Sequence, residues 1–190
     1  MLIYRQQLFF SRLFSVISII FTAYLILNMA VHKLHLDEFD EVDYDLIAIH
    51  SSLEDYRLAY FINQKLPVTL SKSKEEIGVT IKEGEALFSK FVFNDYNNDI
   101  LWSLVPNKNE IITYKKSTGQ NLFLNRDVEI ATKVYLLSEL KKVDYFLKIE
   151  NNQGHFDIDE IIQHIKSVTQ ISTVYTVNPE KIKSKNNLIF

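Results

Sequence analysis

The sequence predicts an α+β domain: one mainly antiparallel sheet with two helices on a face, preceded by an apolar N-terminal helix. Three observations support this prediction. Strand-like patterns dominate the chain, two segments show a helical spacing of apolar residues, and the connections between strand candidates are short. Short connections favour antiparallel neighbours, since parallel strands need a long crossover. We expect one domain over residues 32–180, with an apolar segment at 1–31 and a tail at 181–190.

The domain opens with a strand and a helix. Residues 42–50 (VDYDLIAIH) pass from alternating positions to an almost continuous apolar run, which is typical of a strand that enters a sheet interior. Two serines then precede two acidic residues at the spacing of a capping box. This pattern predicts a helix that begins after Ser51 and Ser52, runs to about Gln64 and is ended by Pro67.

Strand candidates occupy the middle of the chain, at residues 77–81, 87–93, 100–105, 110–114 and 129–137. Turns rich in asparagine and aspartate, at 94–99 and 106–109, separate three of them. We therefore expect these strands to form antiparallel meanders.

The last part of the domain reads as strand, helix, strand. Apolar and polar residues alternate from Val143 to Glu150, which predicts a strand with one buried face. Asp157 can cap the following helix and Glu160 completes the capping box. The apolar residues of this helix are Ile158, Ile161, Ile162, Ile165 and Val168. A strand at 171–177 follows, so the segment forms a βαβ-like unit.

The N-terminal apolar segment leaves two interpretations open. Residues 13–31 carry no charge, and this length approaches the roughly 20 residues of a membrane-spanning helix. Arg5 and Arg12 precede the stretch and weakly favour a cytoplasmic N-terminus. Met29, however, is a second plausible start directly ahead of the domain. The chain is a single-pass membrane protein if residues 1–28 are present, and a cytoplasmic protein if it starts at Met29.

Composition excludes several classes of function. The absence of cysteine excludes thiol catalysis, disulfides and cysteine-bound metals. The chain has 4 Gly in 190 residues, far below the average of about 7%. This low number disfavours a glycine-rich phosphate-binding loop. The net charge of −3 gives no overall attraction to nucleic acid or to an anionic membrane. We expect no cofactor.

An acidic run is the only candidate for metal binding. Six acidic residues fall between Asp37 and Asp45, next to His32 and His35, and carboxylate and imidazole groups suit several metals. The run lacks the spacing and the glycine of a calcium loop. We interpret it as a solvated approach to the first strand and expect no metal ion.

Two histidines are near acidic residues in the sequence. His50 precedes Glu54 and Asp55, and His164 lies four residues after Glu160. Such pairs can act as acid and base when they line a cleft. On a helix surface they are usually solvent-exposed neighbours. Because no established catalytic motif accompanies them, we expect no catalytic residues.

Residues 137–145 read Leu-Ser-Glu-Leu-Lys-Lys-Val-Asp-Tyr. This segment resembles the signature of the bacterial IPExxx-VDY family, which is Ile-Pro-Glu, three variable residues and Val-Asp-Tyr. Four residues match at the family's spacing: Glu139, Val143, Asp144 and Tyr145. Ser138 stands where the family has proline. The resemblance spans nearly all of residues 29–190 and implies a small domain of unknown function that starts near Met29.

The motif itself looks like a β-hairpin corner between the strands that end near Leu136 and begin at Val143. Two roles stay open for its carboxylates. Glu139 and Asp144 are either structural groups of a turn and a sheet surface, or part of a recognition edge with Tyr145 or Phe146.

The tail is basic and then apolar. Its candidate partner-docking residues are Lys181, Lys183, Lys185, Leu188, Ile189 and Phe190. A terminal apolar triplet is costly to leave in water, so the tail docks either on its own domain or on a partner.

These features favour a non-enzymatic interaction or adaptor domain that binds an unidentified protein through a sheet edge and the tail. One alternative is an RNA-binding accessory module, which requires a joint basic and aromatic patch with Lys90, Lys115 and Lys116. The lack of an RNA-recognition signature makes nucleic acid the less favoured partner. A second alternative is a small enzyme, which requires the acidic and histidine side chains to share a cleft.

Overall fold

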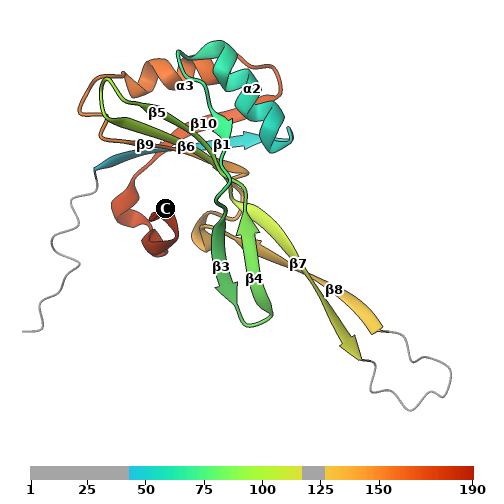
Figure 1. Cartoon of the computed structure of the whole chain (residues 1–190). Helices are drawn as coiled ribbons and strands as arrows, with labels where there is room; N and C mark the ends of the chain where they lie inside the picture. Colours follow the sequence, from blue (N-terminus) through green and yellow to red (C-terminus); the bar gives the residue numbers. More distant parts are fainter. Residues whose placement is uncertain (1–42, 117–126) are drawn as a thin grey trace, which may run out of the picture. The chain divides into compact units, whose positions relative to one another are not determined.

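A six-stranded antiparallel sheet forms the centre of the fold (Figure 1). The computed structural model describes residues 43–116 and 127–190, within a unit that runs from Val42 to Phe190. In sheet order the strands are β10 (Ile171–Val177), β1 (Tyr44–Ser51), β9 (Tyr145–Glu150), β6 (Ile100–Pro106), β5 (Phe91–Asp95) and β2 (Ser71–Lys72). All neighbouring strands are antiparallel, which confirms the predicted α+β class with a mainly antiparallel sheet.

Two helices connect strands of this sheet. Helix α2 (Asp55–Lys65) follows β1, and α3 (Ile158–Lys166) joins β9 to β10. Strand β9 lies between β1 and β6, while β1 lies between β9 and β10, so the two strand–helix–strand units interleave. The order β10-β1-β9-β6 is that of a split βαβ arrangement, with the difference that β2 to β5 lie between α2 and β6 in the chain. It places the start of β9, where the motif ends, beside the end of β1.

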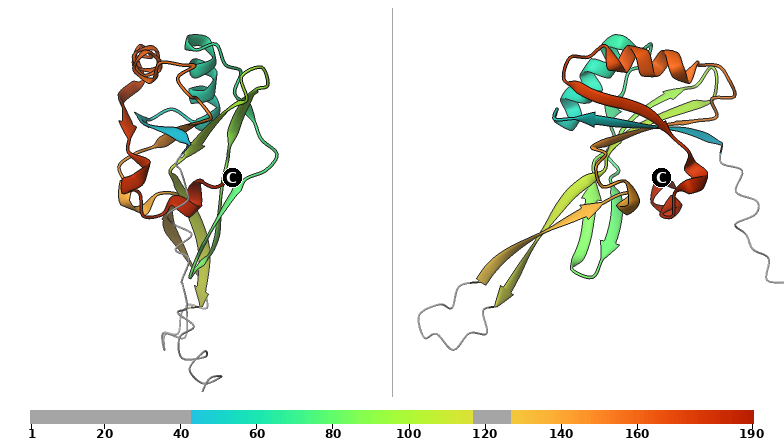
Figure 2. Two further views of the ribbon diagram at one scale, coloured as in Figure 1. Left: turned by 90° about the vertical axis from the view of Figure 1, so that its left-hand side faces the viewer. Right: turned by 180° about the vertical axis from the view of Figure 1, so that it is seen from behind.

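Both helices cover one face of the sheet, as the sequence predicts (Figures 1 and 2). The sheet residues that meet them include Ile49, Trp102 and Leu147, which are fully buried. The helices contribute apolar side chains from one stripe each, at helical spacing. Because each fully buried side chain of this kind stabilises the fold by about 1.5–3 kcal/mol, this cluster is a main source of stability.

The two helix starts differ from each other. Asp157 caps α3 as predicted, and its carboxylate accepts a hydrogen bond from the Asp159 amide at 2.9 Å. The predicted serine cap of α2 is wrong, because β1 continues to Ser51 and the N-cap residue is Glu54. The Ser51 hydroxyl accepts a hydrogen bond from the Leu53 amide at 3.2 Å instead. This serine therefore shapes the strand-to-helix turn rather than the helix end.

The opposite face of the sheet is covered by two hairpin ribbons and the tail (Figure 2). One ribbon pairs β3 (Ile77–Ile81) with β4 (Gly84–Phe88), and the other pairs β7 (Lys108–Lys116) with β8 (Asp127–Tyr135). Side chains from both ribbons, the sheet and the tail form a second buried cluster that contains Phe88, Val134, Leu137, Phe146 and Leu188. We call the β7–β8 ribbon the arm and residues 181–190 the tail.

One predicted strand is in fact two. The segment predicted as a single strand at 87–93 divides at Ser89 and Lys90, so that β4 joins a ribbon and β5 joins the sheet. The reason is a change of face: Phe88 belongs to the second cluster, whereas Phe91 belongs to the cluster under the helices.

The predicted hairpin corner at the motif is also wrong. Strand β8 pairs with β7, and β9 pairs with β1 and β6. The motif begins in a short 3₁₀ turn, Ser138–Leu140, that carries the chain from the arm into the sheet.

The predicted N-terminal apolar helix, His32, His35 and the part of the acidic run at 37–41 lie outside the described residues, whereas Asp43 and Asp45 lie within them. A search of the described ranges finds no helix that is long and apolar enough to cross a membrane.

Candidate functional site

The motif segment wraps around one buried side chain, Asn107. Its amide nitrogen donates hydrogen bonds to the carbonyl oxygens of Leu140 and Val143, at 2.8 and 3.1 Å. Its amide oxygen accepts from the backbone N–H of Leu137 at 2.8 Å. The Asn107 backbone also bonds to Leu136 and Asp144. One residue thus satisfies five polar groups of residues 136–144, which fixes the path of the motif.

The end of the motif holds the turn between β1 and α2. Asp144 accepts a hydrogen bond from the Ser51 amide at 3.0 Å and forms an ion pair with Lys108 at 2.5 Å. The Tyr145 hydroxyl donates to the Leu53 carbonyl oxygen at 2.6 Å. Burial, together with the negative charges of Asp55, Glu54 and Asp144, raises the pKa of Tyr145 to about 12. Val143 is buried in the second cluster.

Glu139 contacts the tail. One carboxylate oxygen accepts hydrogen bonds from the amides of Lys183 and Ser184 at 2.7 and 3.0 Å, and the other accepts from the Ser184 hydroxyl at 2.6 Å. Partial burial opposes ionisation of Glu139, but the bonds from Ser184 and Lys183 outweigh it and lower the pKa to about 2. The motif and the tail, two separate candidates in the sequence, therefore meet in one site.

The tail lies on its own domain in short 3₁₀ turns rather than in a strand. Leu188 is 1% exposed in the second cluster, Phe190 packs against that cluster, and Ile189 is 76% exposed. The side-chain nitrogen of Asn187 donates to the Leu136 carbonyl oxygen at 2.7 Å. Lys181 and Lys183 point to solvent and Lys185 is half-buried.

A buried charge pair lies beneath the tail. Lys148, 3% exposed, donates hydrogen bonds to Glu150 at 2.8 Å and to the Leu188 carbonyl oxygen at 2.7 Å. Its ammonium group lies 4.9 and 5.0 Å from the ring centroids of Tyr44 and Phe190. At these distances each ring face attracts the cation. Lys148 is therefore the main polar group that the sheet offers to the tail.

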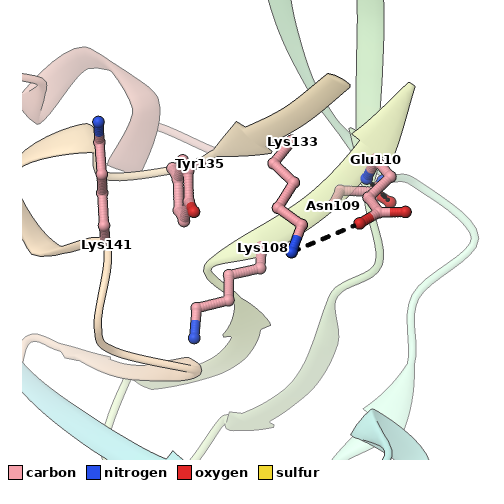
Figure 3. Close-up of a pocket in the computed structure, with 6 residues that line it drawn as sticks. All are labelled: Lys108, Asn109, Glu110, Lys133, Tyr135 and Lys141. Carbon is pink, nitrogen blue, oxygen red and sulfur yellow. Dashed lines mark hydrogen bonds and ion pairs between the residues drawn. The ribbon is translucent and has the colours of Figure 1, made fainter. Parts of the chain in front are cut away.

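A groove lies at the base of the arm, with a volume of about 510 Å³ (Figure 3). Lysines dominate its lining, which consists of Lys108, Asn109, Glu110, Lys133, Tyr135 and Lys141. The single carboxylate of this set, on Glu110, is 3.9 Å from the Lys133 ammonium group. The Lys141 ammonium group lies 5.7 Å from the Tyr135 ring centroid. The lining therefore holds three ammonium groups and one carboxylate, and Lys108 also pairs with Asp144 beside it.

The acidic and histidine residues that the enzyme alternative requires in one cleft are distributed over more than one place in the fold. His50 lies 3.9 Å from Asp144, whose carboxylate also binds Lys108 and the Ser51 amide. Glu54 and Asp55 line a hollow of about 320 Å³ that Lys108, the partner of Asp144, also lines. Ser89 donates a hydrogen bond to Asp55 there at 2.7 Å.

The other two acid–base candidates are remote from that turn. His164 lies 3.5 Å from Glu160, and both line an open hollow of about 160 Å³ together with His155, whereas Glu139 binds the tail. Within residues 43–116 and 127–190, no group of three or more potential ligands is placed to hold a metal ion.

The lysines named for RNA binding are also separated along the fold. Lys90 lies 5.2 Å from the Phe190 ring centroid, beside the tail. Lys115 and Lys116 occupy the distal end of β7, paired with Val128 and Asp127.

Sequence reasoning missed Asn107 and Lys148. Asn107 reads as a turn residue, and no local pattern separates it from its exposed neighbours. Lys148 occupies a polar position in the alternation of β9, whose other face was expected to be solvated. The sequence does offer one indication that this face is covered: Phe146, a large apolar residue, lies on the same face as Lys148. In the structure both side chains are buried.

No family model, no curated protein and no solved structure matches this chain.

Proposed function

We propose that this chain is a non-enzymatic protein-interaction domain of the IPExxx-VDY type, and that the arm is its contact surface. The main support for this proposal is that apolar side chains of the arm are exposed. Ile112 is 58% exposed and Ile130 is 36% exposed, on a ribbon whose strands have only each other as strand partners in the described chain.

The construction of the arm supports this proposal. An isolated two-stranded ribbon is marginally stable in water, and exposed isoleucine side chains gain free energy when a partner covers them. The base of the arm is fixed, because Asn109 donates a hydrogen bond to the Leu87 carbonyl oxygen and Ile111 packs on the second cluster. The rest of the arm extends away from the sheet (Figure 1). The arm thus combines a fixed base with an exposed isoleucine on each face, Ile112 beside Ala131 on one and Ile130 beside Thr113 on the other.

Charge indicates the chemistry of the partner. The groove at the base of the arm is lined by Lys108, Lys133 and Lys141; Lys108 already pairs with Asp144 and Lys133 lies 3.9 Å from Glu110, which leaves Lys141 as the cation most available to a partner. A segment that places apolar side chains on Ile112 and carboxylates in the groove complements both features. We therefore propose an acidic, partly apolar protein segment as the partner.

The engagement of the motif acids supports a non-enzymatic role. Asp144 binds the Ser51 amide and Lys108, and Glu139 binds three groups of the tail. These carboxylates already stabilise the fold, so neither is arranged as a free base above a substrate cavity.

Photo-crosslinking tests the proposal in cells that express the full chain. A photoreactive amino acid replaces Ile112, and the control position is Tyr60, which is 58% exposed on α2. We expect a discrete cross-linked protein from position 112 and none from position 60. Equal yields from both positions would contradict the proposal, and a ribonuclease-sensitive product would favour the RNA-binding alternative.

A pair of substitutions tests the chemistry of the partner. Ala131 is exposed and lies opposite Ile112 across the arm, on the same face. Ala131→Glu places a negative charge beside Ile112 and should lower the cross-link yield about tenfold, whereas Ala131→Lys should not lower it. A loss of equal size in both variants would contradict an acidic partner.

A further inference from the structure

The tail is attached to the domain through few groups. In the described chain, residues 183–190 form hydrogen bonds to three groups outside this segment: the Glu139 carboxylate, the Leu136 carbonyl oxygen and the Lys148 ammonium group. No strand ladder ties the segment to the sheet. Of its eight residues, only Leu188 is buried. Ordering eight residues has a large entropic cost, which offsets most of the stabilisation from these few contacts and leaves the tail weakly held.

The surface beneath the tail is suited to water as well as to the tail. Lys148 and Glu150 form an ion pair there, and the second oxygen of Glu150 has no hydrogen-bond partner among the described residues. When the tail leaves, water can hydrate both charges, so opening does not strand an unpaired charge in an apolar interior. A permanently closed interior gains little from such a pair. The charged floor thus distinguishes this contact from the apolar cluster under the helices.

The seat also has the chemistry of a peptide-binding site. We define the seat as Glu139, the Leu136 carbonyl, Lys148, Lys90 and the apolar site that holds Leu188. The Glu139 carboxylate accepts hydrogen bonds from two successive backbone N–H groups, and the Lys148 ammonium group donates one to a backbone carbonyl oxygen. The ammonium groups of Lys90 and Lys148 both lie near the aromatic ring of Phe190. These contacts recognise a segment that forms a short 3₁₀ turn, with leucine four residues after the second bound amide and an aromatic residue two positions later.

We propose that residues 183–190 form a latch that opens while the rest of the domain stays folded, and that the open seat binds a peptide of the tail's own chemistry in trans. The occupant is a segment with a leucine and an aromatic residue at this spacing. The resident tail competes with it at a high effective concentration, because it is covalently linked to the seat. This inference does not depend on the arm.

The binding test uses the full chain with a weakened tail. Leu188→Ser combined with Phe190→Ala removes the apolar anchors of the tail but leaves every side chain of the seat in place. The probe is a fluorescent synthetic peptide with the sequence of residues 181–190, and the matched control peptide carries the same two substitutions. We expect the weakened chain to bind the probe at least about tenfold more tightly than the unmodified chain does.

Variants of the seat distinguish specific binding of the probe from non-specific binding. Adding Glu139→Gln removes the charge that accepts the two amides and should weaken binding of the probe about tenfold. Glu180→Gln, a nearby acid whose side chain is exposed, should leave binding unchanged. The proposal would be overturned if the weakened chain stays folded and binds the probe no more tightly than it binds the control peptide. Unfolding of the weakened chain would overturn it as well, because the domain would then not persist without the docked tail.

Hydrogen exchange of the unmodified chain provides an independent measurement. The amides of Lys183 and Ser184 are held by Glu139 and should exchange by a local opening, at least about tenfold faster than the paired amides of β9. Glu139→Gln should increase that ratio. Exchange of the tail amides only together with β9 would show that the tail is part of the cooperative core.

Discussion

At the residue scale, Asn107 determines where the motif lies. Its side chain is completely buried and makes three hydrogen bonds to the backbone of the segment that follows the arm. A buried polar group of this kind stabilises through its bonds, and its removal leaves several backbone groups without partners. The stability of the domain should therefore depend strongly on this one amide.

Asn107→Ala should lower the free energy of unfolding by about 3 kcal/mol, because two carbonyl oxygens and one N–H lose their buried partner. Asn97, in an exposed turn, supplies the matched control, and Asn97→Ala should change the free energy by less than about 0.5 kcal/mol. Urea titration followed by circular dichroism measures both. Equal effects at the two positions would contradict the structural role of Asn107.

Tyr145 links the motif to the β1–α2 turn and gives a prediction at alkaline pH. Its raised pKa means that the folded state resists ionisation while the unfolded state ionises near the ordinary value of 10. Stability contributed by the neutral phenol is thus complete below pH 10 and decreases as the pH rises from about 10 to about 12. We expect Tyr145→Phe to remove this part of the alkaline decrease.

At neutral pH the same substitution should cost about 1 kcal/mol, since the hydrogen bond to the Leu53 carbonyl oxygen is lost. Ultraviolet titration of the phenols and urea titration at several pH values measure the two effects. A phenol at position 145 that titrates near pH 10 in the folded chain would contradict the contact.

At the element scale, the tail depends on the charge of Glu139. The pKa of this carboxyl is lowered from 4.5 to about 2 in the folded chain. A lowered pKa means that the contribution is present above pH 4.5 and is lost as the pH falls from about 4.5 to about 2. Docking of the tail should therefore be independent of pH between 5 and 8 as far as Glu139 is concerned.

Hydrogen exchange of the Ser184 amide at several pH values, corrected for the intrinsic rate, tests this dependence. We expect protection to decrease below pH 4.5 in the unmodified chain, and to be low and insensitive to this titration in Glu139→Gln. Release of the tail between pH 5 and 8 would show that a different group controls docking.

Local patterns predicted most elements but not their partners. The helix at Asp157 was predictable because its cap and its apolar spacing are contained within a dozen residues. The break at Ser89 and the pairing of β8 with β7 were not, since both depend on which buried cluster a strand meets. Alternation in β9 predicted a solvated face, yet the tail and the ribbons cover that face and bury Lys148.

The sequence indicated several residues of the candidate site, but it did not indicate that they lie together. Glu139 and the tail were both selected from the sequence, from a motif and from a terminal apolar triplet. Their contact spans more than forty positions, and no spacing rule reports it. Lys148, the third participant, looks like an ordinary surface lysine until the chain folds around it.

At the scale of the whole molecule, the described chain uses its polar groups to hold segments together and leaves the arm uncovered. The acids of the motif bind the tail and the β1–α2 turn, and both faces of the sheet are buried. Ile112 and Ile130 remain exposed on the arm. This distribution is the basis for proposing a binding domain rather than an enzyme.

The most direct test of this claim is hydrogen exchange of the full chain with and without the protein recovered through the cross-link at position 112. The account predicts that the amides of the arm, at 111–113 and 130–132, exchange quickly in the isolated chain and become at least about tenfold more protected when the partner binds. Protection that falls on the helices or the hollow beside Glu54, with the arm unchanged, would contradict it.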